Sequence, residues 1–274
     1  MRRQRVIKIA ASALLLFSCK KDPNPMVPPP APVPKILLKD IDITGQRPHF
    51  YHFEYNKDST VSLASFASGL GVYDVLYSGN KIAEMRDITP SNKDTLRYVY
   101  NSQGKLAMIN EIDDDTHVIT RHLVFTFDRD TLKKIERDHK EESGFFIDMV
   151  QQFDYYPDGN LKTKVGLLRD ISGEFTDTTR YEQYDSKMNV DDFNIVNGSV
   201  NEHLFLFQGF RLQKNNPGRV TFTQPGGLNN SISTYTYTYN QDNTPSQKTG
   251  DIFTNGTGLG SGVHVPFTTT YTYY

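Results

Sequence analysis

Tyrosines cluster in the last strand-like stretches of the sequence, and they are the side chains there with the clearest binding chemistry. Tyr235, Tyr237 and Tyr239 alternate with threonine, and Tyr271 and Tyr273 repeat the pattern at the C-terminus. Residues that alternate along a strand share one face, so neighbouring strands would place five phenol rings side by side. Such rings could form a platform that stacks on sugars. The alternative is that they pack the interior of the sheet or pair across strands.

The other reactive side chains form no catalytic or metal-binding pattern. Seven histidines are scattered along the chain, and no pair has the His-Glu-x-x-His spacing of zinc enzymes. The run Asp113 to Asp115 lacks the alternating order of calcium ligands, so we interpret it as a solvated loop and keep calcium binding as the alternative. A serine lies among glycines at Gly258 to Gly262, without the Asp and His order that would activate it. We therefore predict no catalytic residue, no metal ligand and no cofactor.

The composition indicates a β protein without a strongly charged partner. The chain has 274 residues, with 16 Tyr, 17 Phe, 19 Gly and 14 Pro but no Trp, a mixture that favours strands and turns. The 30 basic and 32 acidic residues leave a net charge of −2, so we expect no nucleic-acid partner.

The N-terminus has the pattern of a secretory signal. Arginines and a lysine precede an apolar run from Ile9 to Phe17, which is too short to span a bilayer as a helix. We assign residues 1–18 to a signal peptide. From Pro23 to Pro34, seven residues are proline, which favours an extended polyproline II conformation of about 3.1 Å per residue. Residues 19–35 are therefore expected to be a tether, with a ligand for an aromatic groove as the alternative.

Cys19 is the only cysteine in the chain, so no intrachain disulfide can form. The stretch Leu16 to Cys19 resembles the lipobox of bacterial lipoproteins. The resemblance implies that Cys19 carries palmitate-like acyl chains. Lysine, and not aspartate, follows Cys19 directly, and in this the sequence resembles Gram-negative lipoproteins that are transported to the outer membrane. Whether the protein faces the periplasm or the cell surface stays open. The alternative is an ordinary signal peptide with an incidental cysteine.

One unit recurs between residues 36 and 274: an alternating stretch that ends in aromatics, a polar turn and an aliphatic restart. The copies lie at residues 53–61, 76–82, 98–106, 125–132, 155–161 and 181–190, with degraded copies at 215–220 and 237–243. Asn and Asp tolerate left-handed backbone, Gly supplies it freely, and Pro157 presets a turn. Period-two alternation with short turns predicts antiparallel neighbours. We expect about 14 to 18 strands in one long meander, curled into an open or closed barrel-like sheet.

The best copy of the turn, from Asp154 to Lys162, resembles the YD repeats of RHS-type proteins. The whole layout of lipobox, proline tether and tyrosine-rich meander is similar to a family of Gram-negative outer-membrane lipoproteins with a porin-like domain of unknown function. These resemblances imply an all-β, barrel-like fold and no activity. The last strand has Thr268, Thr270 and Thr272 on one face and aromatics on the other, so neither face is the apolar band of a membrane-inserted barrel. We expect a barrel outside the bilayer.

The predicted function is a non-catalytic binding or scaffolding module for a glycan, a peptide or an envelope partner. One alternative is a hydrolase of envelope or dietary polymers that uses carboxylates converging inside the curled sheet. Another is a structural β shell.

Overall fold

The computed structural model describes residues 36–90, 94–170, 173–195, 211–227, 229–255 and 262–274. Cys19 and the proline-rich tether lie outside these residues. The strands of the first half are β1 Leu38–Ile43, β2 Tyr51–Tyr55, β3 Val61–Phe66, β4 Gly71–Ser78, β5 Lys81–Asp87, β6 Asp94–Tyr100, β7 Leu106–Asp113 and β8 Val118–Asp128. Those of the second half are β9 Thr131–Glu141, β10 Gly144–Tyr155, β11 Leu161–Asp170, β12 Gly173–Tyr184, β13 Pro217–Thr223, β14 Ser231–Tyr239, β15 Pro245–Thr254 and β16 Val263–Tyr273. Short 3-10 turns lie at η1 Ala67–Gly69, η2 Asp192–Ile195 and η4 Pro225–Gly227.

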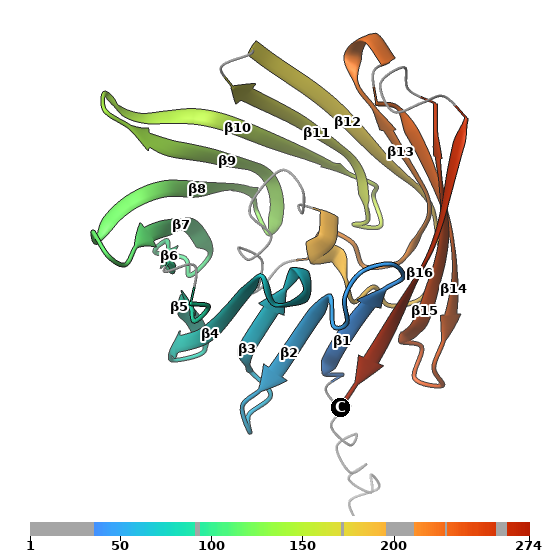
Figure 1. Ribbon diagram of the computed structural model, residues 1–274, viewed down its shortest axis with the longest axis horizontal. Coiled ribbons are helices and arrows are strands. Elements are labelled where there is room, and N and C mark those ends of the chain that lie inside the picture. The colour runs from blue at the N-terminus through green and yellow to red at the C-terminus, as the bar shows by residue number, and fades with distance from the viewer. Residues whose placement is uncertain (1–35, 91–93, 171–172, 196–210, 228, 256–261) are drawn as a thin grey trace, which may run out of the picture. The chain divides into compact units, whose positions relative to one another are not determined.

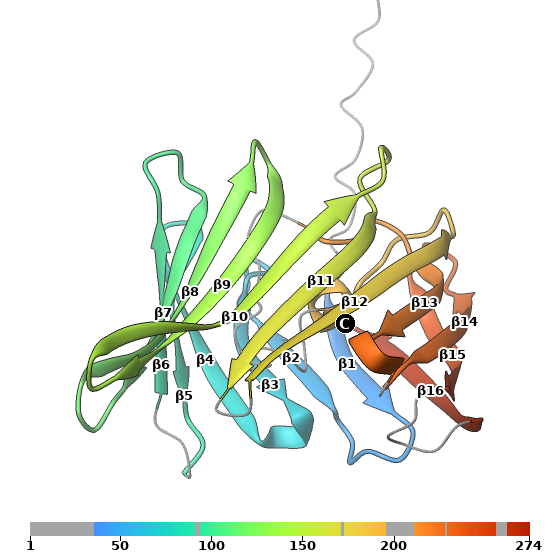
Figure 2. The ribbon, with the colours of Figure 1, turned by 90° about the horizontal axis from the view of Figure 1, so that it is seen from above.

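The sixteen strands close into one antiparallel barrel (Figures 1 and 2). Each strand pairs with the next, and β1 pairs with β16, where Ile41 lies opposite Tyr271. Closure leaves no strand edge unpaired in this sheet, which removes the template for edge-to-edge aggregation. The predicted all-β meander is therefore confirmed, in its closed form.

Four of the predicted turns share one backbone geometry. In each, the first residue donates its N–H to the carbonyl of the fifth, and the fourth donates back to the first. The fourth residue has a left-handed φ in every case: 65° at Ser59, 80° at Gly104, 88° at Gly159 and 66° at Asn243. This geometry favours glycine or asparagine, which explains the side-chain preference of the repeated turn.

Tyrosine hydroxyls fasten neighbouring strands at the end of the barrel where these turns and both ends of the described chain lie, which we call the termini end. Each of five tyrosines near the end of an even-numbered strand donates to a carbonyl at the start of the preceding strand. The pairs are Tyr55 to Leu38 at 2.7 Å, Tyr100 to Ile82 at 2.9 Å, Tyr184 to Leu161 at 2.7 Å, Tyr237 to Pro217 at 3.1 Å and Tyr273 to Pro245 at 2.7 Å. Tyr55, Tyr100 and Tyr184, each directly before a polar turn of the repeat, are therefore architectural elements.

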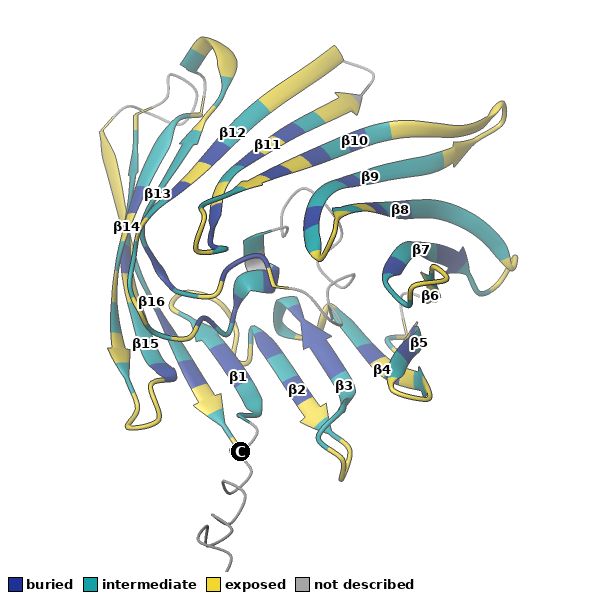
Figure 3. Ribbon diagram, turned by 180° about the vertical axis from the view of Figure 1, so that it is seen from behind, coloured by how far each residue is buried: buried dark blue, intermediate teal, exposed yellow. Residues whose placement is uncertain are grey.

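The buried residues alternate along the strands, and the inner face of the barrel holds the apolar core (Figure 3). The outer face carries charged and polar residues together with exposed apolar ones such as Leu76, Val99 and Val165. Met85 on β5 lies opposite Leu96 on β6, and both are fully buried. Alternate residues on the same strands point outward, and there Glu84 accepts from Arg86 at 2.7 Å and from Arg97 at 3.1 Å. Among the described residues, no helix is long and apolar enough to cross a membrane.

Candidate functional site

The described parts of the connection between β12 and β13, residues 185–195 and 211–216, fold into the barrel. The 3-10 turn η2 lies inside the ring of strands in Figure 1. Phe193 of η2 packs edge-on against Tyr51 and Phe53 of β2, with ring centroids 5.2 and 5.8 Å apart. Leu212, on the returning part of the connection, is fully buried in the same core. The connection therefore fills part of the lumen with apolar side chains of its own, and we call residues 185–195 and 211–216 the plug.

A buried ion pair fixes the plug to the barrel wall. The Asp191 carboxylate accepts from Lys248 Nζ at 2.9 Å and from the Tyr271 hydroxyl at 2.7 Å. Burial is the largest single influence and disfavours the charged form of Lys248. The attraction of Asp191, the neighbouring Tyr235 and the hydrogen bond to Asp191 together outweigh it and raise the pKa of the ammonium group. On the opposite wall, Lys164 Nζ donates to the Ile195 carbonyl at 3.1 Å.

The turn "YYPDGNL" holds the other edge of the plug. The amide oxygen of Asn160, a residue only 1% exposed, accepts from the backbone N–H groups of Lys214 and Asn215, both at 3.0 Å. Lys214 Nζ donates to the Asp158 carbonyl at 2.8 Å. The Asp158 carboxylate caps its own turn by accepting from the Asn160 N–H at 2.9 Å, which lowers its pKa. This turn therefore positions the plug.

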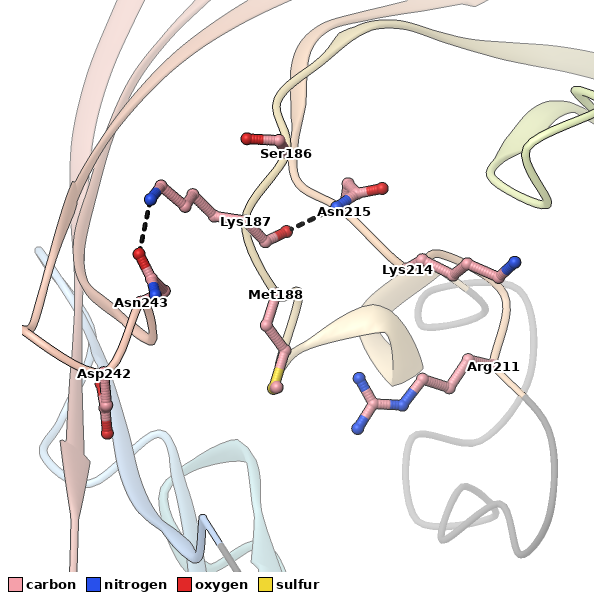
Figure 4. Close-up of a pocket in the computed structure, with 8 residues that line it drawn as sticks. All are labelled: Ser186, Lys187, Met188, Arg211, Lys214, Asn215, Asp242 and Asn243. Atoms are coloured by element: carbon pink, nitrogen blue, oxygen red, sulfur yellow. Dashed lines mark hydrogen bonds between the residues drawn. The ribbon is translucent and has the colours of Figure 1, made fainter. Parts of the chain in front are cut away.

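A polar cleft of about 480 Å³ opens where the plug meets the β14–β15 turn (Figure 4). Its lining residues are Ser186, Lys187, Met188, Arg211, Lys214, Asn215, Asp242 and Asn243. In Figure 4, Lys187 reaches toward Asn243 on one side of Met188, while Arg211 and Lys214 lie on the other side. The cleft therefore presents cations on two sides.

The cations of the cleft are bound to neutral oxygens. Lys187 Nζ donates to the Asn243 side chain at 2.5 Å, and Arg211 Nη1 donates to the Asn189 carbonyl at 3.1 Å. The one carboxylate in the lining, Asp242, accepts from the Thr244 N–H at 3.0 Å, and this hydrogen bonding lowers its pKa. Among the residues that the structure describes, Lys187, Arg211 and Lys214 form no salt bridge, although Arg211 attracts the buried Asp192 and Lys214 attracts Asp158. The lining has three cations and one carboxylate, and this excess of positive charge suits an anionic ligand.

Two acids in the lumen have raised pKa values. Burial raises the pKa of Asp192 to about 6, although its carboxylate accepts from the Leu212 N–H at 2.9 Å. Burial also raises the pKa of Asp177, against the attraction of Lys164. Asp192 belongs to the plug, and Asp177 belongs to β12. Within the described part of the chain, no group of three or more His, Cys, Asp or Glu residues is arranged to hold a metal ion.

The five tyrosines of the predicted sugar platform lie on the inner face of the barrel. Tyr237 and Tyr273 donate to strand carbonyls as described above, and Tyr271 binds Asp191. The Tyr239 hydroxyl donates to Asp185 of the plug, and Tyr235 packs edge-on against Phe267. The strand alternation thus brings the rings onto one face as expected, and their use as a ligand platform stays a prediction.

Sequence reasoning missed the cleft. Lys187 was assigned to a turn, and residues 215–220 were interpreted as a degraded copy of it, whereas Asn215 and Asn216 end the plug and β13 begins at Pro217. The available signal was the interval between Tyr184 and Pro217. It is longer than any other connection and carries no alternating pattern.

No protein-family model matches the sequence, and a search of curated proteins finds no relative. Solved structures do match. A porin-like protein from Bacteroides vulgatus ATCC 8482 is 15% identical with a TM-score of 0.59, over 88% of this chain and 99% of that one. A porin-like protein from Bacteroides uniformis ATCC 8492 is 13% identical with a TM-score of 0.58, over 82% and 89%.

The chain has a porin-like fold. At these identities the likeness shows the fold alone, so the predicted porin-like architecture is confirmed. The lipoprotein family, the YD repeats and the lipid anchor stay predictions.

Proposed function

We propose that the protein is a non-catalytic binding module of the cell envelope. Its site is the polar cleft, and its ligand is a hydrophilic molecule with carboxylate or phosphate groups, such as an acidic glycan or peptide. The observation that carries the proposal is the lining of the cleft, where Lys187, Arg211 and Lys214 are bound to neutral oxygens. An anionic ligand would replace these contacts with charge-assisted hydrogen bonds, which are about twice as strong as neutral ones.

The rigidity of the plug supports this role. Asp191, Phe193 and Asn160 fasten it to three parts of the barrel wall, so the cleft is preorganised in the unliganded protein. Preorganisation lowers the entropy lost on binding.

The charged outer wall supports a barrel that stands outside the bilayer. The outward Glu84, Arg86 and Arg97 would face lipid in an inserted barrel, where arginine at the midplane costs about 2–4 kcal/mol. We propose that acyl chains on Cys19 anchor the protein to the outer membrane instead, with residues 19–35 as the tether.

Fractionation tests the anchor. Wild-type protein should sediment with membranes, and the Cys19→Ser variant should be released into the soluble fraction. An unchanged distribution would refute the lipid anchor.

Titration calorimetry tests the cleft. The purified lipidated protein should bind acidic oligosaccharides or acidic peptides more tightly than their neutral counterparts. The pair of changes Lys187→Gln and Arg211→Gln should weaken this binding at least tenfold. The matched control is Lys57→Gln with Arg129→Gln, which removes the same two charges from exposed turns far from the cleft. Equal losses in both variants, or release of cleavage products from the ligand, would refute the proposal.

A further inference from the structure

The outer face of the last three strands is covered by threonine. Residues alternate along each strand, and the inward neighbours Tyr237, Lys248 and Tyr271 are tied to the core or the plug. The intervening residues therefore point outward. We call the following set the threonine face: Thr234, Thr236 and Thr238 on β14, Thr249 on β15, and Thr268, Thr270 and Thr272 on β16.

The register aligns these threonines in rows across the strands. Thr236 lies opposite Thr249, which lies opposite Thr268, so one row contains threonine only. In the next row Gln247 lies between Thr238 and Thr270. Neighbouring strands are about 4.8 Å apart and alternate residues along a strand about 6.8 Å apart, so the rows form a regular array of hydroxyl and methyl groups.

Most hydroxyls of the array have no hydrogen-bond partner among the described residues. Thr272 donates to Asp40 at 2.9 Å, and Thr238 is hydrogen-bonded to Ser246 at 2.9 Å. Within the part of the chain that the structure describes, the hydroxyls of Thr236, Thr249 and Thr268 make no hydrogen bond to another protein group. A ligand could use each of them as donor and acceptor.

The threonine face carries no charge, unlike the rest of the wall. Charged residues border it: Arg219 and Asp251 lie opposite Thr234, and Asp40 and Asp42 of β1 lie opposite Thr272 and Thr270. Asp251 also follows Thr249 by two residues on β15, so it limits the uncharged area at that end. Elsewhere the outward residues include ion pairs such as Arg97 with Glu84. Loss of charge at the centre of a surface patch is typical of a contact region. A patch without charge forms no ion pair with a charged ligand, so it suits a neutral ligand.

From this geometry we infer that the threonine face binds a neutral polysaccharide. The threonine methyl groups would pack against the C–H faces of the sugar rings, and the free hydroxyls would exchange hydrogen bonds with sugar hydroxyls. The face is separate from the cleft: it lies on the outside of the barrel, and its ligand differs in charge. It does not depend on the proposed function of the cleft.

Affinity electrophoresis of the native full chain tests the inference, with gels that contain amylose, laminarin, galactomannan, arabinoxylan or, as the acidic probe, polygalacturonate. At least one neutral polymer should retard the wild-type protein. The triple variant Thr236→Val, Thr249→Val and Thr268→Val, which keeps side-chain shape and removes the hydroxyls, should bind that polymer at least tenfold more weakly. A second variant, Thr249→Lys, should lose retardation as well.

The control triple variant is Thr126→Val, Thr163→Val and Thr176→Val, which changes outward threonines of β8, β11 and β12. It should be retarded like the wild type, and circular dichroism should show the same melting for both triple variants. Absence of retardation by every neutral polymer overturns the inference, and so does unchanged retardation of the threonine-face variants. Retardation by polygalacturonate alone also overturns it, while it supports the cleft. If the wild-type protein forms dimers and Thr249→Lys dissociates them, the threonine face is a self-association surface and the inference is overturned.

Discussion

Removal of the Asp191 carboxylate should destabilise the barrel through the lysine that it leaves behind. Asp191 is 8% exposed and Tyr271 5%, and the side chain of Lys248 keeps 17% of its surface. Breaking a buried ion pair by removing one partner costs about 3–5 kcal/mol, and the residual exposure of Lys248 favours the lower end. A domain of this size loses about 2–4 °C of Tm per kcal/mol. Asp191→Ala should therefore lower the Tm by about 6–12 °C.

Thermal melting followed by circular dichroism measures this effect. The double variant Asp191→Ala with Lys248→Met removes the stranded charge and should recover at least half of the lost Tm. The control Asp154→Ala breaks an exposed pair with Lys162, in which the two atoms are 3.7 Å apart, and should change the Tm by less than about 2 °C. A small effect of Asp191→Ala, or no recovery in the double variant, would show that the ion pair between Asp191 and Lys248 does not hold the plug against the barrel wall.

Three further predictions concern the plug, the turns and the tyrosines. The folded-state pKa of Asp192, about 6, lies above its ordinary value of 3.8, so the folded protein binds more protons between these values. The free energy of unfolding should therefore fall by about 2 kcal/mol as pH rises from 4 to 6. Asp192→Asn should remove this slope in urea titrations, and an unchanged slope would assign it to another group. Gly159→Ala should cost more stability than Gly79→Ala. Both have left-handed φ, but only the first places a Cβ 2.6 Å from Lys214 Nζ, so the flexible lysine must move and give up its bond to the Asp158 carbonyl. Equal losses would show that this bond does not stabilise the plug. Tyr100→Phe should cost about 1 kcal/mol in urea unfolding, because it removes the bond to the Ile82 carbonyl, and a neutral result would show that the hydroxyl does not fasten the strands.

The fold was predictable because its signals are local. The alternation of Tyr235, Tyr237 and Tyr239 with threonine fixes the two faces of a strand, and the Asn and Gly residues of the turns fix the reversals. Whether the sheet closes could not be deduced, because closure depends on the pairing of Ile41 with Tyr271 across 230 residues of sequence. Local patterns carry no information on such a contact.

The cleft was not predictable because its parts come from two separate connections. Lys187 and Arg211 lie in the two different segments of the plug, and Asn243 belongs to the β14–β15 turn. Each of these residues is ordinary in its own sequence context. Asn160 explains why the turn "YYPDGNL" is the best copy of the repeat: its side chain binds the plug as well as closing the turn.

Hydrogen exchange with mass spectrometry tests the role of the cleft most directly. The wild-type chain should be compared with and without a saturating acidic ligand found by calorimetry. We predict slower exchange confined to residues 185–188, 211–215 and 240–244, and no such protection in the variant with Lys187→Gln and Arg211→Gln. Protection centred on another part of the barrel, or unchanged protection in that variant, would contradict the assignment of the cleft as the binding site.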